Sequence, residues 1–232
     1  MKKRIMALIL SALLCLSFAA CGNSENSKEN TDIESKQVVE STAENNEETL
    51  SSEDESSENA INIDPNRETD IRNTCWGDSR EVVRSLESDS PKLDEGNMLV
   101  YDVFVDGVKV TLAYVFNEQN QLCEALYTVD DSDGSKGTTM VEKFAHIGGA
   151  IAQKYGNDYK VDSKKLSSLA DYCDDVGEAV ELGYIEVYES WNYVKGGRCT
   201  IKGSLTRKNY TVTGSFLLSS TSISSPKSEP GI

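Results

Sequence analysis

The chain has 232 residues, with 39 acidic and 23 basic side chains and one histidine, so its formal net charge is −16 at pH 7. An acidic surface repels phosphate backbones, and the sequence contains no basic stripe interleaved with aromatic residues, so it argues against nucleic-acid binding. The same charge argues against direct contact with anionic lipid head groups.

The first twenty residues have the pattern of an export signal. Lys2, Lys3 and Arg4 form a positive start, and an apolar run follows over residues 5–14. The whole apolar stretch over residues 5–20 is shorter than the roughly 20 residues that a membrane-spanning helix needs. We therefore expect residues 1–20 to be a signal peptide that is removed.

The run Leu16-Ser17-Phe18-Ala19-Ala20-Cys21 resembles the lipobox of bacterial lipoproteins, although Phe18 stands where that pattern usually has leucine. The resemblance implies a diacylglyceryl group on the sulfur of Cys21, cleavage before this residue, and anchorage at the extracytoplasmic face of the cell membrane. Two acyl chains hold a protein on a bilayer far more firmly than one chain does. The alternative is ordinary cleavage near residues 17–20, which would release a free secreted protein.

Residues 21–71 are expected to form a disordered acidic tether behind the lipidated cysteine. Between residues 22 and 64, 13 acidic side chains stand against two lysines, which gives this stretch a net charge of −11. Low hydrophobicity combined with high net charge cannot offset the entropy of the chain by burying apolar surface. The segment is interpreted as a solvated spacer that holds the folded part off the membrane.

Residues 72–219 are predicted to form a globular α+β domain around one core, and residues 220–232 a loose tail. A short helix is expected after Asp78, a good N-cap with Glu81 three residues later. The dipeptide Asp106-Gly107 favours the positive φ angles of a tight hairpin turn. Alternating apolar residues on both sides of it predict three strands, over residues 98–105, 109–116 and 122–129.

A second helix is predicted from Thr139, which forms a capping-box pattern with Glu142, to Gly156. Gly148 and Gly149 inside it suggest the close approach of a backbone or a large ring. Residues 163–182 leave room for one more short helix, and three strands are expected over residues 184–193, 198–205 and 210–218. The helix carries one apolar stripe, made by Met140, Phe144, Ile147, Ile151 and Tyr155.

These elements predict two units, each a helix followed by a three-stranded meander, over residues 74–130 and 138–218. Together they would form an antiparallel sheet covered by helices. The opening Trp76-Gly77-Asp78-Ser79 and the order of elements resemble the small α/β modules of bacterial envelope lipoproteins of the outer-membrane-assembly type. They are also similar to the β-lactamase-inhibitor-like fold, which pairs two such units. The resemblance implies binding to other proteins through the sheet face and loops.

No catalytic residue, cofactor or metal site is predicted. His146 is the only histidine, no serine or cysteine nucleophile motif accompanies it, and a zinc site would need further ligands. The acid pairs Asp130-Asp131 and Asp174-Asp175 are interpreted as solvated loop charges. The loop before Gly134 lacks the carboxylate ligands that an EF-hand requires, because Val129 and Met140 stand at the first and last positions.

Four cysteines remain after residues 15 and 21 are set aside: Cys75, Cys123, Cys173 and Cys199. An exported domain permits disulfides, and four cysteines allow three connectivities. If each unit is closed on itself, Cys75 pairs with Cys123 and Cys173 with Cys199. The alternative is that all four are free thiols that act as small apolar residues.

One predicted strand is unusually aromatic and suggests a binding surface. Tyr184 and Tyr188 fall on one of its faces, and Trp191 and Tyr193 on the other. One face must belong to the core, and the other would offer aromatic area for contact with an extracytoplasmic protein or glycan. The sequence thus favours a lipid-anchored binding module. The alternative is a hydrolase that acts on cell-wall or extracellular polymers through carboxylates.

Overall fold

The computed structural model describes residues 63–191 and 194–226. The expected signal peptide, the lipidation site Cys21, most of the tether, Tyr193 and residues 227–232 lie outside the described residues. Within the described ranges, no helix combines the length and the apolar character that crossing a bilayer requires.

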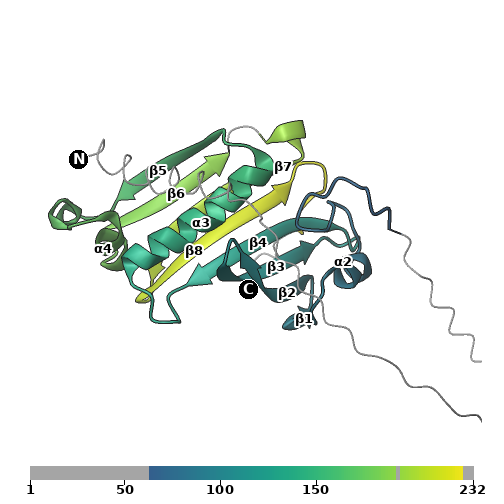
Figure 1. The fold of residues 1–232 in the computed structure, drawn as a ribbon, viewed down its shortest axis with the longest axis horizontal. Helices are drawn as coiled ribbons and strands as arrows, with labels where there is room; N and C mark the ends of the chain where they lie inside the picture. The colour runs from purple at the N-terminus through teal and green to yellow at the C-terminus, as the bar shows by residue number, and fades with distance from the viewer. Residues whose placement is uncertain (1–62, 192–193, 227–232) are drawn as a thin grey trace, which may run out of the picture. The chain divides into compact units, whose positions relative to one another are not determined.

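The domain is α+β and is built on one antiparallel sheet of eight strands in the order β1-β2-β3-β4-β8-β7-β6-β5 (Figure 1). The helices are α2 (Arg80–Leu86), α3 (Gly137–Tyr155) and α4 (Val176–Glu181), with 3-10 turns at Ser168–Tyr172 and Lys195–Gly197. The strands are β1 (Leu93–Glu95), β2 (Met98–Val105), β3 (Val108–Phe116), β4 (Leu122–Asp130), β5 (Tyr159–Lys165), β6 (Ile185–Trp191), β7 (Cys199–Lys208) and β8 (Thr211–Ser220).

The expected strands are found, and two further strands join them. β2 has the predicted bounds, and the turn after it has φ angles of 47° at Asp106 and 79° at Gly107, as the hairpin requires. β1 and β5 were not expected. They form the two edges of the sheet, and most of their residues are exposed, so they lack the apolar alternation by which the other strands were recognised.

Both predicted helices form, but each begins at a different residue. Ser79 rather than Asp78 caps α2, accepting a hydrogen bond from the amide of Val82 at 3.4 Å. Asp78 instead accepts hydrogen bonds from the amide of Cys75 and from the guanidinium of Arg67, each at 2.7 Å. α3 begins at Gly137, two residues before the expected cap, without a side-chain cap, and ends before Gly156 as predicted.

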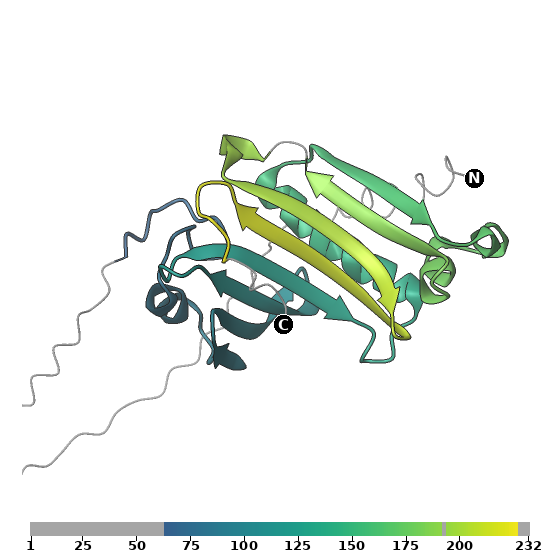
Figure 2. The same cartoon turned by 180° about the vertical axis from the view of Figure 1, so that it is seen from behind.

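The core lies between one face of the sheet and α3. The stripe residues Met140, Phe144, Ile147 and Ile151 are all buried against it, as predicted. Phe144 stacks on Phe216 of β8 with ring centroids 4.5 Å apart. Seen from behind, the opposite face of the sheet has no helix across it in the described part of the chain (Figure 2).

The segment before α2 packs on the domain, although the sequence interpretation assigned it to the tether. Ile71 is fully buried and Asp70 is 8% exposed. The Asp70 carboxylate accepts a hydrogen bond from the amide of Trp76 at 2.9 Å and faces the guanidinium of Arg198 at 3.5 Å. Packing therefore begins by residue 70, before the expected boundary at residue 72.

Candidate functional site

Strand β6 divides its side chains between the two faces of the sheet. Ile185, Val187, Glu189 and Trp191 are buried on the face that α3 covers, and the residues between them are half-buried on the open face. Trp191 stacks on Tyr159 with centroids 4.9 Å apart, and its indole N–H donates to the carbonyl of Gly156 at 2.9 Å. It therefore belongs to the core.

The open face of the same strand carries Tyr188. Tyr188 is half-buried there, and its hydroxyl donates to Glu186 Oε2 at 2.5 Å. Tyr184, just before the strand, is also half-buried, and Tyr193 lies outside the described residues. Of the suggested binding surface, Tyr188 is thus the residue placed on the uncovered face.

The other candidate residues do not converge on one site. His146 Nδ1 lies 2.8 Å from Asp106 Oδ2, and both side chains are substantially exposed. Asp131 accepts the amide of Val212 at 2.9 Å, and Asp175 caps α4 by accepting the amide of Glu178 at 2.8 Å. These acids serve turns and caps. The part of the chain that the structure describes holds no group of three or more histidine, cysteine, aspartate or glutamate side chains placed to bind a metal ion.

In the structure, Cys75, Cys123, Cys173 and Cys199 are all free thiols. Cys123 and Cys199 are buried, and burial raises the pKa of each thiol to about 11. A thiol with so high a pKa carries little thiolate at neutral pH and is a poor nucleophile. Neither buried cysteine has the chemistry of a catalytic group.

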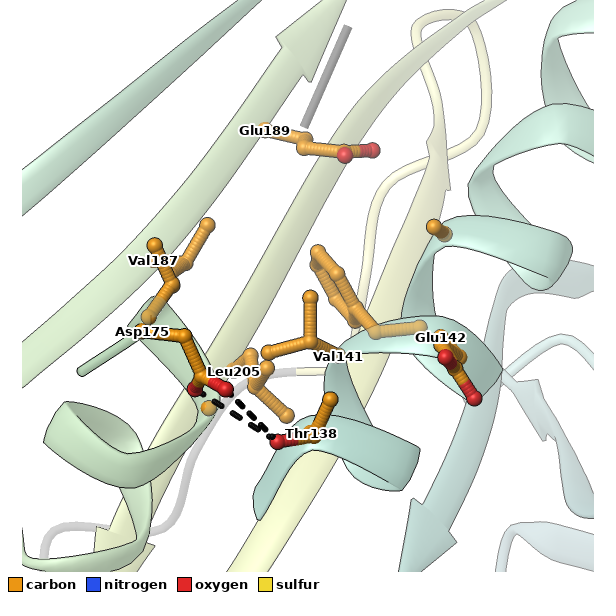
Figure 3. A pocket seen from close by; sticks show the side chains of 11 residues that line it. Thr138, Val141, Glu142, Asp175, Val187, Glu189 and Leu205 are labelled. Atoms are coloured by element: carbon orange, nitrogen blue, oxygen red, sulfur yellow. Dashed lines mark hydrogen bonds between the residues drawn. The ribbon is translucent and has the colours of Figure 1, made fainter. Parts of the chain in front are cut away.

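A cavity of about 200 Å³ lies between α3, α4 and the sheet (Figure 3). Its walls are mostly apolar and come from segments far apart in the sequence. The lining residues are Thr138, Val141, Glu142, Phe144, Ala145, Asp175, Val176, Gly177, Val187, Glu189 and Leu205.

Glu189 provides the polar group inside this cavity. The residue is only 3% exposed, and its Oε2 atom has no hydrogen-bond partner. Burial penalises the charged form and raises the pKa of the carboxyl from 4.5 to about 8. At neutral pH most of the molecules therefore hold Glu189 as an uncharged acid.

The strand pattern and two glycines explain how a glutamate fits here. Alternation along β6 directs Glu189 into the core, opposite Gly203 of β7. On the facing helix, a Cβ atom at Gly148 would lie 2.7 Å from Glu189 Oε2 and 3.3 Å from the ring of Phe216. Glycine at position 148 thus lets α3 pass directly over the carboxyl and the ring, which confirms the close packing expected there.

The cavity has a polar, exposed rim formed by the first two turns of α3 and the N-cap of α4. Thr138, Glu142 and Asp175 are exposed, and the Thr138 hydroxyl donates to Asp175 Oδ2 at 3.2 Å. Figure 3 shows Glu189 at one end of the site, with Thr138 and Asp175 at the other and the apolar walls between them. A group that enters at the rim can therefore pass along apolar side chains before it meets the carboxyl.

The chain brings α3 and α4 together at the rim through two further glycines. A Cβ atom on Gly137 would overlap the carbonyl oxygen of Gly177, and one on Gly177 would overlap the backbone of Thr138. The amide of Gly137 donates to Glu181 Oε2 at 3.0 Å. Backbone contact of this kind fixes the position of α4 and so the width of the entrance.

The sequence analysis missed Glu189 because it considered acidic residues only where two of them stand next to each other in a loop. A usable signal was present in the run Ile185, Val187, Glu189 and Trp191, where an acid occupies a core position of an alternating strand. A carboxyl in a cleft whose pKa is shifted by burial is a candidate functional position.

Comparisons of the chain with protein-family models, with curated proteins and with solved structures found no match.

Proposed function

We propose that this chain is a lipid-anchored extracytoplasmic binding module, and that the cavity beneath α3 receives a group presented by its ligand. The observation that carries the proposal is the unpartnered Oε2 atom of Glu189 inside an apolar cavity with an exposed rim. A buried polar atom without a hydrogen bond costs about 1–3 kcal/mol. A ligand that donates to this atom recovers that free energy on binding.

The anchor and the tether belong to this proposal. The lipobox-like run before Cys21 supports attachment to the outer side of the cell membrane, and the net charge of −11 over residues 22–64 supports a solvated spacer. The ligand would then be an extracytoplasmic protein or glycan that reaches the domain above the membrane. Nothing in the charge of the chain favours a nucleic acid.

Two structurally related units are also part of the proposal. The strand order places β1 to β4 on one side of the sheet and β5 to β8 on the other, with β4 and β8 adjacent at the middle. One helix precedes each set of four strands along the chain. This arrangement supports the pairing of two helix-plus-meander units, each with one strand more than the sequence predicted, as in the β-lactamase-inhibitor-like fold that the chain resembles.

The alternative function is a carboxylate-based hydrolase of cell-wall or extracellular polymers. The observation in its favour is the same side chain, because a carboxyl whose pKa is raised to about 8 can act as a general acid at neutral pH. Such an enzyme also needs a second carboxylate, for which Glu142 and Asp175 at the rim are the candidates.

The test is capture of partners by the full chain from the envelope and secreted fractions of its own organism, after crosslinking and with mass spectrometry as the readout. Ala145 lines the cavity and is 6% exposed, so Ala145→Leu fills the space with another good helix former. The matched control is Ala150→Leu, on the same helix outside this cavity.

A partner that binds the wild type and the control but not Ala145→Leu supports the proposal. A partner that binds all three proteins contradicts the role of the cavity. Breakdown of a polymer substrate by the wild type, abolished by Glu189→Gln, would favour the hydrolase instead.

A further inference from the structure

We propose that the cavity takes an organic cation: a primary ammonium group on an apolar stem, with the ammonium donating to Glu189 Oε2 and the stem lying between α3 and the sheet. The inference rests on the proposed function, because it names the chemistry of the ligand for the same cavity.

The charge of the lining favours a cation. Three of its residues, Glu142, Asp175 and Glu189, are acids, and no lysine, arginine or histidine is among the lining residues. The two rim acids are exposed and would attract a positive group toward the entrance. A carboxylate ligand would be repelled by the two acids at the rim, and it would find another acid, Glu189, at the inner end of the cavity.

The walls favour an apolar stem of limited length. Val141, Val187 and Leu205 line the path between the rim and Glu189, and Phe144 also lines the cavity. A cavity of about 200 Å³ has room for about six or seven water-sized groups, at about 30 Å³ for each water. A chain of four or five carbons with a terminal ammonium fits that space.

Binding of the cation is coupled to loss of the Glu189 proton. Below a pH of about 8 the free acid is uncharged, so the ammonium enters, the carboxyl O–H bond breaks, its proton leaves to solvent, and an ammonium–carboxylate pair remains. Other titratable groups face this region from three elements: Tyr159 of β5, Glu142 of α3 and Asp175 of α4. The neighbouring parts of β7 and β8 present Gly203, Leu205 and Phe216, which do not titrate.

Two sources can present this chemistry: a free alkylamine, or a lysine side chain of a partner protein. Both place an ammonium at the end of an aliphatic stem. Separate probes in the same experiment distinguish them.

The experiment is isothermal titration calorimetry of the full chain with pentylammonium chloride, 1-pentanol and sodium pentanoate, which match in chain length and differ in charge. We expect pentylammonium to bind at least tenfold more tightly than the other two. Its affinity should rise about tenfold per pH unit up to about pH 8 and then level off, with up to one proton released per molecule bound.

Two variants distinguish the effect of the buried Glu189 carboxyl from the effect of the negative charge of the domain as a whole. Glu189→Gln should weaken pentylammonium binding at least tenfold at pH 8 and abolish its pH dependence below that value. The matched control Glu186→Gln, on the same strand but on the open face, should bind as the wild type does.

Equal binding of pentylammonium and 1-pentanol, or unchanged binding in Glu189→Gln, would overturn the cation proposal but leave the cavity as a binding site. Absence of binding by pentylammonium would also overturn it, and the effect of Ala145→Leu on partner capture would then show separately whether the proposed function survives. A second titration, with N-acetyl-lysine methylamide, assigns the source. Binding of pentylammonium alone indicates a free amine, and binding of both indicates that a lysine side chain can enter.

Discussion

Replacing Glu189 by glutamine should stabilise the domain, and by an amount that grows with pH. The folded state keeps the carboxyl proton up to a pH of about 8, whereas the unfolded chain releases it near 4.5. Between these values the folded state binds more protons than the unfolded state, so the free energy of unfolding falls as the pH rises.

The size of this effect follows from the shift in pKa. At about 1.36 kcal/mol per unit, the cost of the buried acid reaches about 3 kcal/mol at pH 7 and about 5 kcal/mol once the pH exceeds 8. Glutamine has nearly the same shape and does not titrate, so Glu189→Gln avoids this cost. The two proteins should have similar stability near pH 4, diverge steadily up to about pH 8, and keep a constant difference above it.

Urea unfolding of the full chain, followed by tryptophan fluorescence at several pH values between 4 and 9, measures the difference directly. Glu186→Gln serves as the control, because Glu186 lies on the open face of the same strand and should leave the pH dependence of the wild type unchanged. A difference between wild type and Glu189→Gln that stays constant from pH 4.5 to pH 8 would refute the assignment of a buried, uncharged acid.

Three further predictions concern packing and thiol chemistry. Gly177→Ala should lower the free energy of unfolding by about 1–3 kcal/mol in urea titrations, because its Cβ would overlap the backbone of Thr138; an equal or more stable variant would contradict the contact. Trp191→Ala should cost about 3–5 kcal/mol by the same measurement, since the side chain is buried between Tyr159 and Phe216; a loss below 1 kcal/mol would show that the residue is not part of the core. In the folded protein at pH 8, iodoacetamide should modify the half-buried Cys173 well before the buried Cys123 and Cys199, as peptide mass spectrometry would reveal; early modification of Cys123 would contradict its burial.

The hairpin of β2 and β3 was accessible from the sequence because local and global signals agree there. The Asp106-Gly107 turn and the alternation on either side of it predicted the first hairpin, and the structure reproduces the bounds of β2. β5 was missed because an edge strand buries little on either face, so residues 159–165 show no clean period of two.

The cavity was less accessible, because it depends on contacts between distant segments. Gly137 and Gly177 are 40 positions apart in the sequence but in contact in the structure, and the residues around each of them do not predict this contact. Glu189 was the exception: its place in an alternating strand was visible, but whether such an acid has a partner can be decided only in three dimensions.

The strand order has a consequence for how the domain is assembled. β8, the last strand of the described residues, lies between β4 and β7 and joins the two halves of the sheet. Until residues 211–220 have emerged, β4 and β7 each present an unpaired edge that can attract other chains. The two halves of the sheet can therefore pair only after residues 211–220 have been made, and a nascent chain stalled before β8 would expose two strand edges on which aggregation can start.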